Sequence, residues 1–247
     1  MKLIFLGTSH GVPMPGRHYQ SILIETEKGG YLIDAGAPVM ELLINRGYDL
    51  TKLKSIFITH MHTDHSIGLV NTVILASWYY KMMAYDVYLP EELAIKEIKT
   101  ACCSIFHGAL TDRVAFHTVD EGLVFDDGNI RVTAVPNDHM LKYPRKSFSY
   151  LIEHGDERVY VTGDLGHPLT DFPAPEAYKG HVNAFICECA HFSAEKLLPK
   201  LATVKADAVM PIHVFPLDKY DTLAAHADEI PAKLIFPNDG DEFTLPL

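Results

Sequence analysis

His60-Met61-His62-Thr63-Asp64-His65 is the stretch of this sequence that decides the fold class. It directly follows Ser55–Thr59, an apolar and β-rich segment, so we expect a strand to end where three imidazoles and a carboxylate begin. Imidazole and carboxylate are ligands that divalent metals such as zinc prefer. His60 and His62 are two positions apart in an extended loop and can therefore turn toward one ion. Asp64 and His65 fall where a helix should begin, and because neighbouring helical side chains point about 100° apart, they can turn toward a second ion.

Length and composition predict an ordinary folded domain. Of 247 residues, 48% are apolar and 21% are charged, which suits one domain over residues 1–247. No apolar run is long enough to span a bilayer, and the opening segment Met1–Thr8 predicts a first strand rather than a signal peptide. We therefore expect a cytoplasmic protein with no membrane partner.

The charge balance argues against a long nucleic acid as partner. The chain has 21 basic and 32 acidic residues, a net charge of −11, and no run of Lys or Arg. A surface this negative repels polyanions unless its positive residues cluster. A small anion held by metals remains compatible with this charge.

Two groups of residues that can carry chemistry are expected to pack in the core instead. Cys102 and Cys103 are adjacent, and Cys187 and Cys189 are separated by one residue, so neither pair has the C-x-x-C spacing of a zinc knuckle. We expect all four as small buried apolar residues. The aromatic and Met residues of segment 78–83 are likewise expected as core.

Periodicity and turn residues predict an α/β fold of two packed sheets with helices outside. Hairpin turns are expected at 28–30 and 154–157. Helices are expected at 38–46, within 64–83, and at 90–106, 194–201 and 218–227. Strands are expected at 2–6, 21–26, 31–34, 55–59, 86–89, 113–119, 130–136, 147–153, 158–162, 182–187, 206–210, 233–236 and 242–245.

Three later strands end in residues that bind metals. His139, Asp164 and His213 each follow an apolar, β-rich segment. Any one of them alone is more often a turn former or a helix cap, and a histidine-rich surface turn is the alternative for the hexapeptide. Three such strand ends after a H-x-H-x-D-H sequence favour one shared metal site.

Taken together, these residues resemble the metallo-β-lactamase superfamily of hydrolases, and most closely its ribonuclease Z and phosphodiesterase branch. Leu6–Pro13 is similar to that branch's first-strand loop, and Asp34-Ala35-Gly36 to its strand-ending aspartate. Glu188–Ser193 resembles, in shortened form, the region with its glutamate and downstream histidine. The resemblance extends over nearly the whole chain and implies a four-layer αββα sandwich.

The resemblance also implies a ligand set. A first metal would be bound by His60, His62 and His139, a second by Asp64, His65 and His213, with Asp164 bridging them. Zinc is the expected metal, and manganese and iron are alternatives. Two metals about 3.5–4 Å apart activate a bridging hydroxide and stabilise the attacking and leaving oxygens.

Further roles are expected around the metals. Asp64 is a candidate to accept a proton from the nucleophile, and Glu188 with His191 to deliver one to the leaving oxygen; surface placement is the alternative for Glu188 and His191. Asp34 is expected to orient a ligand histidine or, alternatively, to form a turn.

Two loops carry side chains that can face a substrate or only solvent. His10 and His18 lie on the first loop, as substrate-facing residues or as ordinary loop histidines. Lys142, Arg145 and Lys146 follow His139, either to face a substrate phosphate or in a solvated turn.

The chain also departs from the family it resembles. It has no long Gly/Pro-rich arm of the kind that processing ribonucleases use to grip transfer RNA, and Thr63, where many relatives have Gly, is expected as a helix N-cap. We therefore expect a phosphodiesterase that acts on a small molecule or short nucleotide through a metal-bridging hydroxide. Alternatives are a thioesterase or lactonase using the same metals, or a non-catalytic metal-containing sensor or binding module. The resemblance implies a homodimer.

Overall fold

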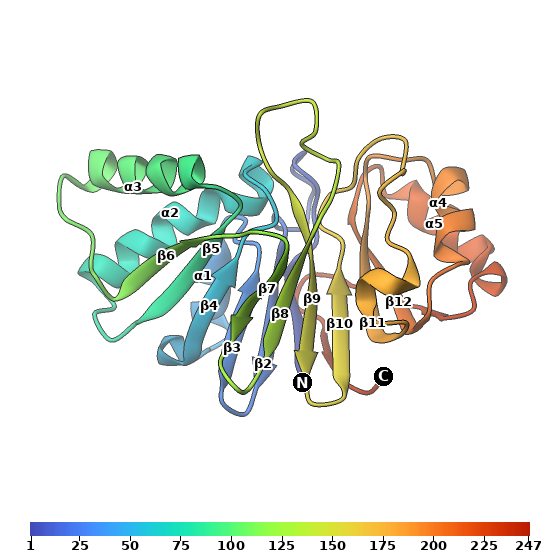
Figure 1. Cartoon of the computed structure of the whole chain (residues 1–247), viewed down its shortest axis with the longest axis horizontal. Coiled ribbons are helices and arrows are strands. Elements are labelled where there is room, and N and C mark those ends of the chain that lie inside the picture. Colours follow the sequence, from blue (N-terminus) through green and yellow to red (C-terminus); the bar gives the residue numbers. More distant parts are fainter.

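Two seven-stranded sheets packed face to face form the centre of the molecule, and helices cover both outer faces (Figure 1). The computed structural model describes residues 1–247. The expected four-layer αββα sandwich is therefore confirmed. None of the helices combines the length and hydrophobicity that a bilayer span requires.

The first sheet has the strand order β14-β1-β2-β3-β4-β5-β6. Strands from β14 to β3 pair antiparallel, and those from β3 to β6 pair parallel. Their bounds are β1 Lys2–Gly7, β2 Ser21–Thr26, β3 Gly29–Ile33, β4 Leu53–Phe57, β5 Tyr85–Leu89, β6 Val114–Thr118 and β14 Glu242–Thr244.

The second sheet repeats this plan in the order β13-β12-β11-β10-β9-β8-β7. Strands from β7 to β10 pair antiparallel, and those from β10 to β13 pair parallel. Their bounds are β7 Gly122–Asp126, β8 Arg131–Pro136, β9 Phe148–His154, β10 Glu157–Val161, β11 Val182–Cys189, β12 Ala206–Val214 and β13 Lys233–Leu234.

Three apolar cores hold these layers together. The central core lies between the sheets, where Phe5 and Ile22 of the first sheet meet Tyr150 and Ile186 of the second. One outer core packs the first sheet against α1 (Val39–Asn45), α2 (Thr63–Trp78) and α3 (Glu92–Phe106). The other packs the second sheet against α4 (Ala194–Leu201) and α5 (Asp218–Ala225). Short 3₁₀ helices span Leu50–Lys52, Pro175–Tyr178 and Ala227–Glu229.

The parallel halves of the sheets determine where the polar residues gather. Parallel neighbours end at the same edge of a sheet. Asp34 and His60 follow β3 and β4, and Asp164 follows β10. Glu188 and His213 are the second-to-last residues of β11 and β12. The loop of residues 137–147, which connects β8 to β9, projects from the sandwich (Figure 1). We call it the β8–β9 loop.

The expected elements form within a few residues of their expected bounds. Two findings differ from the sequence predictions. Strand β7 was not expected, since Gly122–Asp126 is partly exposed and shows no strong apolar alternation. The aromatic and Met segment was wrongly expected in the core: Trp78, Tyr79 and Met82 are 41%, 65% and 72% exposed. Trp78 is the last residue of α2, and Tyr79 and Met82 follow it in an exposed turn, whereas Met83 is buried.

The cysteine prediction holds for three of the four residues. Cys102, Cys187 and Cys189 are buried, whereas Cys103 is exposed. Adjacent residues on a helix point about 100° apart, so α3 buries Cys102 against the first sheet and turns Cys103 to solvent.

Helix α2 packs at backbone contact against the segment that follows β3. A Cβ atom at Gly68 would lie 2.6 Å from the carbonyl oxygen of Ala35 and 3.0 Å from that of Gly36. The Ala35 amide also donates to the His65 carbonyl at 2.7 Å. The close approach therefore fixes the first turn of α2, which carries Asp64 and His65, relative to Asp34.

Gly68→Ala should destabilise the protein, although alanine favours helix by about 1 kcal/mol. The backbone oxygens it meets cannot rotate away, and overpacking costs about 1–3 kcal/mol. We expect a lower melting temperature in thermal denaturation. Asn71→Ala, on the exposed face of the same helix, should leave it unchanged or slightly raised. Equal melting temperatures for the two variants would contradict this account of the packing.

Candidate metal centre

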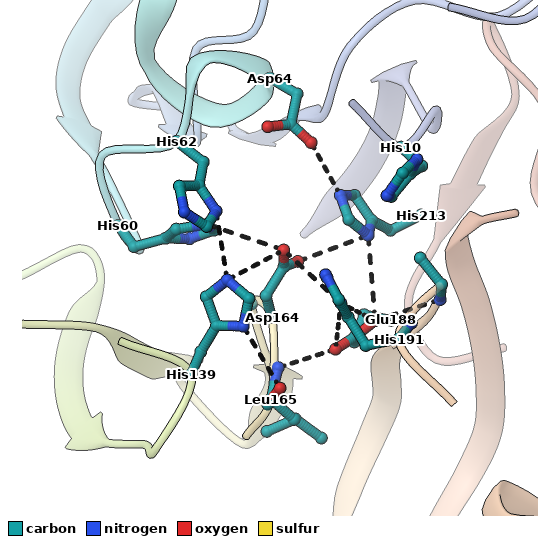
Figure 2. A network of polar contacts seen from close by, with 12 residues as sticks. His10, His60, His62, Asp64, His139, Asp164, Leu165, Glu188, His191 and His213 are labelled. Carbon is teal, nitrogen blue, oxygen red and sulfur yellow. Dashed lines mark hydrogen bonds and ion pairs between the residues drawn. The ribbon is translucent and has the colours of Figure 1, made fainter. Parts of the chain in front are cut away.

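The structure brings all seven expected ligand residues into one place, and Figure 2 labels all of them except His65. Their ligand atoms form overlapping groups in which every pair of atoms lies within 4.8 Å. One group comprises His60, His62, His139 and Asp164, a second comprises Asp64, His65 and His213, and a third comprises Asp164, Glu188, His191 and His213. The groups combine residues from both sheets, so the site lies where the two sheets meet.

Asp164 lies at the centre and faces two groups of imidazoles. Its Oδ2 atom is 3.6 Å from Nε2 of both His60 and His139. Its Oδ1 atom is 3.4 Å from His65 Nε2 and 3.4 Å from His213 Nδ1. The carboxylate therefore has the placement that a bridging ligand requires.

Partners behind the rings fix the orientation of three histidines. The Nδ1 atom of His139 is 3.3 Å from the Leu165 carbonyl oxygen, and that of His60 is 3.1 Å from Thr59 Oγ1. The Nδ1 atom of His65 is 2.7 Å from Asp34 Oδ2. Contacts of this kind select the tautomer that leaves Nε2 free, which is how proteins orient metal-binding histidines.

Asp34 is held rigidly in its place behind the site. It is fully buried, its backbone has a positive φ of 62°, and its Oδ1 atom accepts hydrogen bonds from the Thr59 amide and hydroxyl at 2.8 and 3.0 Å. Non-glycine residues in this conformation are uncommon and concentrate at functional sites. The geometry favours the orienting role for Asp34, with Thr59 as a partner that the sequence did not indicate.

Two buried atoms at the centre suit a cation. Asp164 Oδ1 and His213 Nδ1 are buried and have no hydrogen-bond partner, although they lie 3.4 Å from each other. An unpartnered buried polar atom costs about 1–3 kcal/mol and needs an explanation. Coordination of a divalent metal provides one, because carboxylate oxygen and imidazole nitrogen are its usual ligands. The residues present therefore fit a metal site.

Electrostatics also suits cations. Burial lowers the pKa of His60, His62 and His139, so these rings are neutral near pH 7, the form that binds metals. Burial alone would lower the pKa of His65, but the carboxylates of Asp164 and Asp34 raise it well above its ordinary value. The negative charge of these two carboxylates, which favours a proton on His65, also favours a metal cation at the site.

The two acidic candidate ligands, Asp164 and Asp64, are ionised because neighbouring histidines lower their pKa. Burial disfavours the charge on Asp164, but His213 and His65 outweigh it and hold the pKa well below its ordinary range. For Asp64, burial is likewise outweighed by His213, whose Nε2 atom is 3.0 Å from Oδ2, and the pKa falls to about 2.

Glu188 and His191 form a pair beside Asp164 (Figure 2). Glu188 is buried, which excludes surface placement, and it accepts hydrogen bonds from the amides of Leu165, Ala190 and His191. The Nδ1 atom of His191 is 2.9 Å from Glu188 Oε2, and the ring is about one-third exposed. Burial opposes a charge on this ring, yet the Glu188 carboxylate raises its pKa to about 9.

A cavity of about 330 Å³ opens beside this pair. Its lining combines Asp138, His139, Leu141 and Lys142 of the β8–β9 loop with Leu165, His167, Thr170 and His191. His139 and His191 therefore connect the cavity to the candidate metal ligands.

The basic residues of the β8–β9 loop have different surroundings. Arg145 pairs with Glu91 and with Glu97, the latter at 2.8 Å, and Lys146 Nζ lies 2.9 Å from Asp120 Oδ1. These two side chains are therefore occupied by carboxylates and do not face the site, as the solvated-loop alternative predicted. Lys142 forms no ion pair and lines the cavity.

The two histidines of the first loop, His10 and His18, also have different surroundings. The His10 ring lies against His213 and stacks on Phe215, with centroids 5.2 and 5.3 Å apart, so it borders the site. His18 turns away, and its Nδ1 atom is 2.8 Å from Asp239 Oδ2. The same carboxylate accepts from the Thr8 amide and hydroxyl.

The role of Asp239 could not be predicted from the sequence, because Asn238-Asp239-Gly240 indicates only a turn. Its carboxylate holds the first loop, and the Thr8 carbonyl in turn accepts from the His213 amide at 2.9 Å. His213 itself has a positive φ of 53°. A residue near the end of the chain thus supports the backbone of a candidate ligand.

Thr63 is not the N-cap of α2, as was expected. It is the first helical residue, and His62 occupies the cap position with an extended backbone, φ −61° and ψ 150°. The helix therefore begins one residue earlier than expected, and the His62 side chain makes no capping hydrogen bond. The Ser66 hydroxyl donates to the His62 carbonyl oxygen at 2.9 Å and steadies this turn.

Asp34→Ala should lower zinc affinity about 10- to 100-fold, because His65 loses the partner that orients it. Zinc affinity can be measured by competition with a chromogenic chelator. Asp86→Ala is the matched control: it also removes a carboxylate 2.7 Å from a histidine, His117, but on the surface. Unchanged zinc affinity in a folded Asp34→Ala protein would contradict the orienting role.

Comparison with known proteins places this site in a family. A family model described as anti-Pycsar protein Apyc1 matches residues 1–195. Ribonuclease Z from Gloeothece citriformis is 32% identical over 158 residues, which are 63% of this chain and 48% of that protein. The chain spans about half the length of the curated relatives it matches.

Solved structures share the fold at low sequence identity. Human tRNase Z, short form, has a TM-score of 0.74 and 18% identity, over 100% of both chains. The metallo-β-lactamase fold protein YhfI from Bacillus subtilis has a TM-score of 0.76 and 16% identity, over 98% of both. The expected resemblance to the ribonuclease Z and phosphodiesterase branch is confirmed. Since the family model matches 195 of 247 residues, the chain belongs to the family of the anti-Pycsar protein Apyc1 and has the metallo-β-lactamase fold.

Proposed function

We propose that this chain is a metal-dependent hydrolase that cleaves phosphodiesters in small molecules or short nucleotides. The placement of Asp164 supports this most directly, because its two oxygens face two different groups of imidazoles. A carboxylate shared in this way suits a pair of divalent cations. When bound, such a pair supplies charge stabilisation and a nucleophilic water at neutral pH.

The ligand roles follow the resemblance and two of the three groups of side chains. We assign one cation to His60, His62 and His139, the other to Asp64, His65 and His213, and Asp164 to both. Zinc is the expected metal because imidazoles predominate, with manganese and iron as alternatives. Asp64 acts as a ligand in this scheme and is also the candidate to accept a proton from the nucleophile.

We assign proton delivery to His191. Glu188 holds its Nδ1 atom at 2.9 Å, which leaves Nε2, the atom without a hydrogen-bond partner, for the leaving oxygen. The ring also lines the 330 Å³ cavity, so a leaving group there lies within its reach. Glu188 orients the ring and keeps it protonated, and it needs no contact with the substrate itself.

The size and charge of the protein favour a small substrate. A cavity of 330 Å³ is at the lower end of the range for small-molecule sites, about 300–1,000 Å³. The net charge of −11 repels a long polyanion. Relatives named as ribonucleases match 63–64% of this chain, but the cavity and the charge of this chain support a mononucleotide or short oligonucleotide.

Hydrolysis of bis(p-nitrophenyl) phosphate by protein loaded with zinc or manganese tests the proposal. We expect metal-dependent turnover that falls by at least about 10³-fold in Asp164→Ala, since the shared carboxylate is lost. Circular dichroism should show that the variant is folded. If the wild type binds two metals yet hydrolyses no phosphodiester while it hydrolyses a thioester or a lactone, the proposed substrate class is wrong.

His191→Ala separates proton delivery from a purely structural role. p-Nitrophenolate leaves without protonation, whereas a nucleoside alkoxide requires a general acid. We therefore expect kcat to fall about 10²- to 10⁴-fold with the dinucleotide TpT and about tenfold or less with bis(p-nitrophenyl) phosphate. Equal losses on both substrates would show that His191 does not deliver the proton.

A further inference from the structure

The first loop places His10 at the edge of the candidate metal centre. The His213 amide donates to the Thr8 carbonyl oxygen at 2.9 Å, and Ser9 forms a β-bridge with Val214. These backbone contacts align the loop with the end of β12. The position of His10 is therefore set by the same backbone that carries a candidate ligand.

The His10 ring lies beside a candidate ligand and beside the proposed acid (Figure 2). Its centroid is 5.2 Å from that of His213 and 5.9 Å from that of His191. The next residue, Gly11, passes so near Asp64 that a Cβ atom there would lie 3.2 Å from Asp64 Oδ2. His10 itself belongs to none of the three ligand groups. The ring thus borders the ligands assigned to the second cation without being one of them.

A backbone contact determines which nitrogen of His10 carries the proton. The Val12 amide donates to His10 Nδ1 at 3.1 Å, so Nδ1 is an acceptor and the proton of the ring is on Nε2. No hydrogen bond within the protein uses this N–H group. The ring also stacks on Phe215, with centroids 5.3 Å apart and planes 17° apart, which holds its orientation. His10 therefore presents an oriented and unused N–H donor.

We propose that the Nε2–H group of His10 donates a hydrogen bond to a non-bridging oxygen of the phosphate group that is cleaved. The inference rests on the proposed function, which places this phosphate at the two cations. A hydrogen bond to an ionised acceptor is roughly twice as strong as one between neutral groups. Because the ring is already held in place, the donor needs no reorganisation when charge develops on the phosphate oxygens.

His10 and His191 have different tasks in this arrangement. Glu188 holds Nδ1 of His191 at 2.9 Å and keeps that ring protonated, so His191 has a proton to release. Nδ1 of His10 accepts from a backbone amide instead, and the ring keeps its single proton as a donor. One histidine thus serves the leaving oxygen, and the other binds an oxygen that stays on phosphorus.

Calorimetric titration of the zinc-loaded protein with inorganic phosphate tests this in three variants of His10. His10→Ala removes both the ring and the donor. His10→Phe keeps a ring that can stack on Phe215 but has no N–H group, and His10→Gln has no ring but carries an amide N–H group. We expect the Kd of phosphate to rise about tenfold in His10→Ala and His10→Phe, and less than about threefold in His10→Gln.

Zinc affinity, measured by competition with a chelator, should be the same in the wild type and the three variants, because His10 is not a ligand. A normal Kd of phosphate in His10→Phe with a raised one in His10→Gln would show that the ring only packs, and would overturn the inference. Equal Kd values in all four proteins, or a parallel loss of zinc affinity, would overturn it as well. Failure of the proposed function would show instead as absence of bis(p-nitrophenyl) phosphate turnover by the wild type, whatever the variants bind.

Discussion

The buried carboxylate of Asp164 is the charge on which the arrangement of the site depends. It is removed from solvent at the end of β10, where an ionised group is stable only with compensating positive charge. Imidazoles from both sheets surround it, and the unpartnered Oδ1 atom marks where the protein alone does not satisfy it. The backing contacts, from Asp34 to His65 and from Leu165 to His139, hold the rings toward this point.

The layers of the fold follow from the same requirement. Two half-sheets of parallel strands must end at one edge so that strand ends distant in the sequence can surround one carboxylate. The helices on the outer faces bury the apolar sides of the sheets and leave that edge to loops. Close packing of Gly68 against the Ala35 carbonyl then fixes α2, and with it His65, relative to the segment that follows β3.

Much of this was predictable from the sequence, because apolar strands that end in His or Asp are local patterns. The hexapeptide 60–65, His139, Asp164 and His213 could all be identified this way, and the order of strands and helices followed from periodicity. What could not be predicted depends on contacts between distant segments. Asp239 supports the first loop across more than 200 residues, and the exposure of Trp78 depends on where α2 ends. The pairing of Arg145 with Glu91 also joins distant segments and could not be predicted from the sequence.

Distribution of the candidate ligands over both halves of the chain has a consequence for how the protein matures. The hexapeptide lies in the first third and His213 near the end, so no fragment released early in synthesis contains a complete site. Contacts between residues so far apart form late in folding. Metal uptake would therefore follow assembly of the two sheets, and bound ions would stabilise the finished sandwich by mass action, to an extent set by their free concentration. Scarcity of the bound metal would then reduce the stability of this protein as well as its activity.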